Sequence, residues 1–468
     1  MEAWAAAEVG RAELGDARRT ERLGRVVETL AAHPTASVPQ ACNGDAAAIK
    51  ALYRFWDSAA VTAAAIRQAH QQATIERVHS HPVILAIQDS TELNFTAHPA
   101  TTELGPLAGH GQQGILVHSV LAVSPQGVPL GLLGQESWTR DPEQAGSRHQ
   151  RRKKPTSQKE SGRWLRAQEA TLAALPDDTD VLTIADREAD IYDLFAAPRR
   201  EGAHLLVRAT HNRRMEDTAD GEAAYVWTTL QGAKAAGALT VRLGRTAARP
   251  ECDATLTIRY QAVELQPPRH HRQRSQCVPI PVVAILASEE HPPTGQQPVC
   301  WRLLTTWPVE TLADACGLVE AYTFRWLVER YHYVLKSGCQ VEELQLETAE
   351  RLDRAFATYC VVAWRLLWLT YQARQNPVGP AAAAVTETER MVLAGRMRDL
   401  RRPFPADPTF RDVVRAIAHL GGFIGRKGDG EPGVKTLWRG FHELHLLVLG
   451  WELHQTLTSQ TPPLTSYG

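Results

Sequence analysis

The first 72 residues follow a helical pattern of apolar and polar positions. Apolar side chains recur three and four residues apart around Leu23, Val26, Val27 and Leu30, and again over residues 49–56. Such spacing places apolar residues on one face of a helix, which packs against its neighbours. The pattern predicts a small helical domain over residues 1–72.

A different pattern follows, in which short apolar runs alternate with helical segments. Runs rich in branched residues predict strands, and 3.6-residue periodicity predicts helices. The predicted order is strand, strand, strand, helix, strand, helix, strand, at residues 83–88, 114–123, 128–137, 162–175, 180–185, 190–196 and 203–209. A ribonuclease-H-like α/β fold requires this order, in a mixed sheet whose first and fourth strands lie side by side.

The pattern changes again between about residues 212 and 298. Strand-like runs at 238–243, 254–265 and 278–287 predict a β insertion. Residues 300–306 are then expected to return to the sheet edge, and residues 310–337 to form a helix. A long apolar helix over 355–374, a linker over 375–385 and a helical tail complete the chain. We therefore expect a catalytic domain over 73–375 and a C-terminal helical domain over 376–468.

One predicted helical stretch, residues 322–342, combines charge and aromatic character. At about 100° per residue, Tyr322, Arg325, Glu329 and Lys336 share one face, opposite an apolar stripe. An acid beside two cations and a phenol suits a site that handles anions. The simpler alternative is an exposed helix with ordinary Arg–Glu pairing.

Two carboxylates are expected where predicted strands end. Asp89 is the first acid after the apolar run at 83–88, and Asp186 directly follows the run at 180–185. Side chains at strand ends project into a crevice, and carboxylate oxygens there suit Mg²⁺. With Glu329 they form an acidic trio. Either aspartate has an alternative role as an N-cap, and this alternative is serious for Asp186, because the DREAD segment that it begins is expected to open an amphipathic helix.

Composition adds limits on compartment and partners. The 468-residue chain has a net charge of −1, 44% hydrophobic residues and seven scattered cysteines without a C-x2-C pair. These features argue against a zinc module or a disulfide framework, and no leader or membrane-spanning run is recognisable, so we expect a cytoplasmic protein with no membrane partner. Positive charge is concentrated in residues 148–154 and 269–274. Solvated loops are the ordinary alternative for both runs.

Several motifs together resemble one family. The spacing Y-x2-R-x3-E-x6-K from Tyr322 to Lys336, DREAD at 186–190 and DST at 89–91 are similar to the cut-and-paste DDE transposases of bacterial insertion sequences. The resemblance is to the IS-four family, and within it to the transposon-five type. It extends to ELGDARRTERL at 13–23, ALYRFW at 51–56, VHSVL at 117–121 and LGGF at 420–423, and so covers nearly the whole chain.

The resemblance implies a function for each region. Asp89, Asp186 and Glu329 are expected to bind two Mg²⁺ ions, for which Mn²⁺ substitutes, and to catalyse nicking, hairpin formation, hairpin opening and strand transfer. The N-terminal domain is expected to bind the terminal repeats of the element, and the C-terminal helices to pair two protomers on double-stranded DNA. The residues expected to contact DNA are Tyr322, Arg325, Lys336, Trp301, Arg208, Arg18, Arg19 and Arg54.

Alternatives from other classes remain at this point. One is a DNA-binding regulator or domesticated protein without catalysis, which the intact trio disfavours. Another is a ribonuclease-H-like nuclease, which has no need for the arginine-bearing N-terminal helices. For Trp301, which the resemblance makes the acceptor of a flipped base, the alternative is a core tryptophan packed on the sheet.

Overall fold

The computed structural model describes residues 2–142, 155–215, 224–244, 251–269, 271 and 274–460. It divides into two compact units. The helical unit comprises Met1–Ala73, Glu92–Ile115 and Arg330–Gly468, and the sheet unit comprises Thr74–Thr91 and Leu116–Glu329. The basic run at 148–154 and three residues of the run at 269–274 lie outside the described residues.

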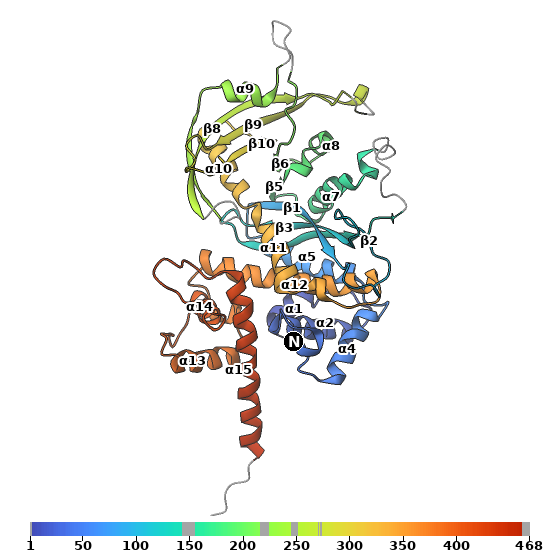
Figure 1. The fold of residues 1–468 in the computed structure, drawn as a ribbon, viewed down its shortest axis with the longest axis vertical. Helices are drawn as coiled ribbons and strands as arrows, with labels where there is room; N and C mark the ends of the chain where they lie inside the picture. Colours follow the sequence, from blue (N-terminus) through green and yellow to red (C-terminus); the bar gives the residue numbers. More distant parts are fainter. Residues whose placement is uncertain are drawn as a thin grey trace, which may run out of the picture. The chain divides into compact units, whose positions relative to one another are not determined.

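The sheet unit is built on a mixed sheet with the strand order β3-β1-β5-β6-β10-β9-β8-β7, in which β4 pairs with β3 (Figure 1). Strand β1 runs parallel to β5, from Val83↔Asp180 to Ile87↔Ile184, and β5 runs parallel to β6. The predicted adjacency of the first and fourth apolar runs is therefore confirmed. The strands are β1 (Val83–Asn94), β3 (Gln113–Val123), β4 (Pro129–Trp138), β5 (Asp180–Ala185), β6 (Ala203–Arg208), β7 (Gly237–Leu243), β8 (Cys252–Leu265), β9 (Ile280–Ser288) and β10 (Cys300–Thr305).

Three helices share one apolar core with this sheet. They are α7 (Arg163–Ala174), α8 (Tyr192–Ala196) and α9 (Val226–Gly232). Their large side chains, among them Trp164, Phe195 and Trp227, are almost fully buried against β5, β6, β8, β9 and β10. A fourth helix, α10 (Leu312–Thr323), contacts β7 and β8. The α/β architecture expected from the alternating pattern is confirmed.

The predicted β insertion is correct in its strands but forms a continuation of the central sheet. Strand β9 pairs antiparallel with β10 over Cys300–Thr305, and β8 pairs with β9. Strand β10 therefore lies between β6 and β9, and the expectation that residues 300–306 return to a sheet edge is wrong. The physical reason is that a long antiparallel ladder satisfies the backbone groups on both sides of β10.

The helical unit contains both terminal regions of the chain. Its long helix α12 (Ala349–Gln375) is buried along most of its length, as the apolar run at 355–374 predicts, and contacts α2, α4, α14 and α15. Its other elements are α1 (Ala3–Val9), α2 (Ala17–Ala32), α3 (Val38–Ala41), α4 (Ala46–Asp57), most of α5 (Ala63–Val78), β2 (Gly105–Pro106), α13 (Glu387–Asp399), α14 (Phe410–Leu420) and α15 (Val434–Gln460).

No helix in the described ranges combines the length and apolar character needed to span a membrane.

Candidate active site

Asp89 lies inside β1, so the prediction that it follows the end of a strand is wrong. The pairing of β1 with β5 nevertheless ends at Ile87↔Ile184, two residues before it. Beyond that point β1 continues while β5 stops at Ala185. The side chain of Asp89 is only 17% exposed, so its carboxylate has lost most of its contact with water.

Asp186 follows β5 directly and begins the DREAD segment. Its Oδ1 accepts a hydrogen bond from the Glu188 backbone N–H at 2.8 Å, which caps the short 3₁₀ helix Arg187–Ala189. Asp186 therefore acts as an N-cap, which was the alternative role considered for it, and its Oδ2 atom takes no part in the capping hydrogen bond. Asp190 is buried at the end of the segment and pairs with Arg213 at 2.5 Å. DREAD thus forms a tight turn held at both ends.

The stretch 322–342 is not one regular helix, which corrects the prediction of a single polar face. Helix α10 ends at Thr323, residues 324–325 form a turn, and α11 (Trp326–Tyr333) starts a new helix. The five residues Val334–Gly338 then form a π-helix. Single-turn π segments often occur at functional sites.

The helix break places Arg325 between two acids of the trio. Its Nη1 lies 3.5 Å from Asp89 Oδ2, and its Nη2 pairs with Glu329 Oε1. Burial acts to lower the pKa of Arg325, but the oxygens of Tyr322, Glu329 and Asp89 outweigh it and raise that pKa. Arg325 therefore remains a cation and partly neutralises two carboxylates.

Asp89 is the acid whose electrostatics are most disturbed. Burial raises its pKa to about 7, the negative charges of Asp186 and Glu329 add to this, and Arg325 and the Ser90 backbone N–H oppose it. A buried carboxyl near two like charges gains if a divalent cation binds. The oxygen-only donor set fits Mg²⁺ or Mn²⁺.

The three acids of the trio are not arranged around a single metal position in this structure. Among the described residues, no group of three or more His, Cys, Asp and Glu side chains is arranged to hold a metal ion. Glu329 is instead paired with Arg325 and its side chain is 55% exposed.

Tyr322 and Trp301 form an aromatic pair beside the acids. Their ring centroids are 5.5 Å apart at an interplanar angle of 65°. Tyr322 is 4% exposed, and its hydroxyl makes no hydrogen bond of normal geometry with any residue that the structure describes, while Trp301 on β10 is only partly buried. Burial raises the pKa of the Tyr322 phenol, and the cations Arg325 and Arg208 oppose the shift. Arg208 itself donates to the Cys300 carbonyl at 3.3 Å.

The other predicted contacts belong to the helical unit. Lys336 lies in the π-helix with its Nζ 3.9 Å from Glu342 Oε1. Arg18 and Arg54 are exposed on α2 and α4, whereas the Arg19 guanidinium donates to the Leu14 carbonyl at 2.9 Å. Arg18 and Arg54 thus present charge to solvent, and Arg19 also braces the start of its helix.

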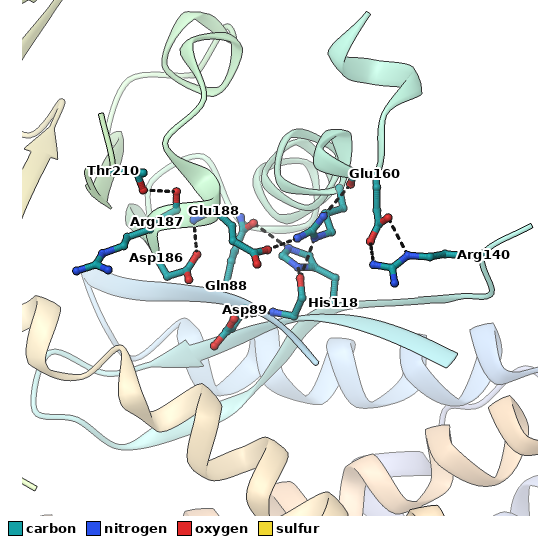
Figure 2. Close-up of polar contacts among 11 residues, drawn as sticks. Gln88, Asp89, His118, Arg140, Glu160, Asp186, Arg187, Glu188 and Thr210 are labelled. Carbon is teal, nitrogen blue, oxygen red and sulfur yellow. Dashed lines mark hydrogen bonds and ion pairs between the residues drawn. The ribbon is translucent and has the colours of Figure 1, made fainter. Parts of the chain in front are cut away.

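A second polar network links the two aspartate-bearing segments, and the sequence analysis did not single it out (Figure 2). Its centre is Arg163 of α7, which is 8% exposed and contacts Ser90 and Glu188. The sequence signal for it is modest, because Arg163 is only a charged residue directly before Trp164 in the helix predicted over residues 162–175.

Three protein-family models match the chain. The family described as "Transposase DNA-binding" matches residues 1–61, the "Transposase DDE domain" matches 165–365, and the "Transposase Tn5 dimerisation domain" matches 361–460. A DDE domain implies a ribonuclease-H-like core and the use of a divalent metal ion, generally Mg²⁺ or Mn²⁺. The flanking matches indicate DNA binding and homodimer formation. The chain therefore belongs to the Tn5-type DDE transposases of the IS4 family, enzymes that cleave DNA and transfer its strands.

Proposed function

We propose that this transposase binds the terminal repeats of its own element, cleaves each end through a hairpin intermediate, and joins the freed ends to target DNA. The observation that carries the proposal is the position of Arg325 between Asp89 and Glu329, with Asp186 close enough to raise the pKa of Asp89. Three acids and a cation in one site suit phosphoryl transfer, in which charge builds up on phosphate oxygens.

The acidic trio is proposed to hold two metal ions. Asp89 would be the ligand common to both ions, with Asp186 as the other protein ligand of one ion and Glu329 of the other. Two such ions would supply activation of the attacking hydroxyl and stabilisation of the leaving oxygen of the phosphodiester. The release of Glu329 frees Arg325 to bind a phosphate oxygen, for which its planar guanidinium is well suited.

Tyr322 and Trp301 are proposed to act on the DNA strand. Within the described part of the chain the buried Tyr322 hydroxyl finds no acceptor, and a phosphate oxygen at this position would satisfy it. Trp301 is partly exposed and is held edge-on by Tyr322, which leaves an aromatic face for a base displaced during hairpin formation. Arg208 is proposed to add positive charge to the same surface.

The remaining regions are proposed to have the roles expected from the three-domain division. Residues 1–72 bind the terminal repeats with Arg18, Arg19 and Arg54 facing phosphates. Residues 73–375 catalyse, and Lys336 neutralises phosphate charge. Residues 376–468 pair two protomers. This division is supported by the separate DNA-binding and dimerisation matches.

The proposal is tested with purified protein and linear DNA that carries the cognate ends, with and without Mg²⁺. Asp89→Asn, Asp186→Asn and Glu329→Gln are each expected to abolish cleavage and retain end binding in a mobility-shift assay. Cleavage retained by any one variant would remove that residue from the trio. End binding without cleavage by the wild-type protein in Mg²⁺ or Mn²⁺ would instead support a DNA-binding regulator.

A further inference from the structure

The distance between the two aspartates is not fixed by the sheet. The last ladder pair of β1 and β5 is Ile87↔Ile184. Asp89 and Asp186 both lie beyond it, where β1 continues as a strand and the chain after β5 turns into a 3₁₀ helix. Backbone pairing therefore leaves their separation undetermined, although shared metal ligation needs it set to within about 0.5 Å.

One side chain spans this gap. Arg163 donates from Nε to Ser90 Oγ at 2.8 Å and from Nη2 to Glu188 Oε2 at 2.5 Å. A third bond runs from Nη1 to the Glu160 carbonyl at 3.1 Å. Ser90 is the residue after Asp89, and Glu188 donates its backbone N–H to Asp186. A single guanidinium thus connects both aspartate-bearing segments.

The connection to Asp89 is short and directional. The Ser90 backbone N–H donates to Asp89 Oδ1 at 2.7 Å. Because Ser90 Oγ accepts from Arg163, its own hydrogen is available for His118 Nδ1 at 2.9 Å, and His118 Nε2 then donates to Gln88 Oε1 at 3.1 Å. This chain of bonds holds the backbone on both sides of Asp89.

The chemistry of the contacts favours a positioning role for Arg163 over general stabilisation. Arg163 is 8% exposed, and its three donors diverge at fixed angles. The guanidinium also stacks 5.4 Å from the Trp164 ring, which restrains its rotation. A lysine carries the same charge but places its donors on one nitrogen, so it cannot reach Ser90 and Glu188 with this geometry.

We propose that Arg163 is a positioning residue that sets the separation of Asp89 and Asp186 for metal binding. This inference rests on the proposed metal role of the two aspartates. Partners of metal ligands of this kind typically change metal affinity or activity by about 10–100-fold when they are removed. Arg163 touches neither the substrate nor the reacting atoms and acts through Ser90 and Glu188.

The test measures Mn²⁺ binding directly, without turnover. Free Mn²⁺ is followed by electron paramagnetic resonance during titration of the full-length protein. Arg163→Met and Arg163→Lys are both expected to raise the Mn²⁺ dissociation constant at least about 10-fold. The matched control is Arg166→Met, one turn further along α7, where the arginine is 48% exposed and pairs with Glu136. This control is expected to bind Mn²⁺ like the wild type.

Folding is checked by the melting temperature of each variant. If Arg163→Met does not fold, Arg163→Lys and Glu188→Gln carry the test, because each retains a polar side chain at its site. Unchanged Mn²⁺ affinity in a folded Arg163 variant would overturn the inference and make Arg163 a structural residue only.

Asp89→Asn in the same titration separates this inference from the proposed function. Loss of Mn²⁺ binding in Asp89→Asn, with wild-type affinity in Arg163→Met, refutes the positioning role alone. Wild-type affinity in Asp89→Asn refutes the metal role of Asp89 and with it the basis of the inference.

Discussion

Replacing Asp89 with asparagine is expected both to abolish cleavage and to stabilise the metal-free protein at alkaline pH. Asparagine has nearly the same shape as aspartate but carries no charge. The folded protein disfavours the Asp89 carboxylate, because burial and the nearby Asp186 raise its pKa from 3.8 to about 7. Removing the charge removes this unfavourable contribution.

The sign and size follow from proton linkage. The folded state holds the Asp89 proton more tightly than the unfolded state, so the stabilising contribution is complete below pH 3.8 and is lost as the pH rises towards 7. Relative to a side chain that is neutral at every pH, Asp89 then destabilises the folded state by about 4 kcal/mol at pH 8, where it is ionised, and by about 2 kcal/mol at pH 5.5, where it must take up a proton on folding. The advantage of Asp89→Asn should therefore grow by about 2 kcal/mol between these pH values.

The assay is urea unfolding in EDTA at pH 5.5 and pH 8, followed by circular dichroism and tryptophan fluorescence. Asp177→Asn is the matched control, since the Asp177 side chain is fully exposed and should show little difference at either pH. An Asp89→Asn variant that is no more stable than wild type at pH 8, or whose advantage does not change with pH, would refute the reasoning. Arg325 would then neutralise Asp89 more completely than its 3.5 Å contact indicates.

Three further predictions concern separate parts of the chain. Trp301→Ala should nick DNA ends at near the wild-type rate but accumulate nicked ends with few hairpins. If nicking falls as much as hairpin formation and the melting temperature is lower, Trp301 has a structural role. Replacing both Leu453 and Leu457 with lysine should preserve single-end binding and eliminate paired-end complexes in a mobility-shift assay, because these two residues of α15 are 61% and 58% exposed. If paired-end complexes still form, the dimer interface lies elsewhere. Burial and the adjacent His445 and His442 lower the pKa of His33 to about 4, so the folded state disfavours its proton and His33 should cost about 1 kcal/mol of stability from pH 7.5 to pH 5.5. The loss of stability over this range, measured by urea unfolding, should therefore be smaller by about 1 kcal/mol in His33→Gln than in the wild type, and an equal loss in both proteins would exclude a contribution from His33.

Much of the fold was predictable because its signals are local. The apolar runs that became β1, β5 and β6 contain branched residues bounded by polar ones, and parallel strands buried on both faces have this composition. The periodicity at Leu23, Val26, Val27 and Leu30 likewise predicted helix α2, where all four side chains are buried.

The helix break at residues 324–325 had no local signal, since no glycine or proline marks it. Its cause is tertiary. The Phe324 ring packs over Gly127, at the turn between β3 and β4, where a Cβ atom would lie 2.5 Å from the ring. Gly127 also has a φ of +84°, a conformation that other residues rarely adopt. This long-range contact lies at the break between α10 and α11, directly before Arg325.

Arg163 was missed for a related reason. Its partners Ser90 and Glu188 lie on segments brought together only by the pairing of β1 with β5. Helical periodicity predicts which face of α7 is buried, but a buried arginine at its start is recognised only once its acceptors are in place. Asp89 and Asp186 could be singled out as candidates from the sequence, because an acid directly after an apolar run is itself a local pattern.

The most direct test of the central claim is the position of Mn²⁺ bound to the active site. Anomalous diffraction from crystals of the protein with cognate end DNA and Mn²⁺ is the measurement. The account predicts anomalous peaks about 2.1 Å from carboxylate oxygens of Asp89, with Asp186 and Glu329 as the other protein ligands and Arg325 released from Glu329. Peaks that lack Asp89, or Mn²⁺ bound while Glu329 stays paired with Arg325, would contradict it.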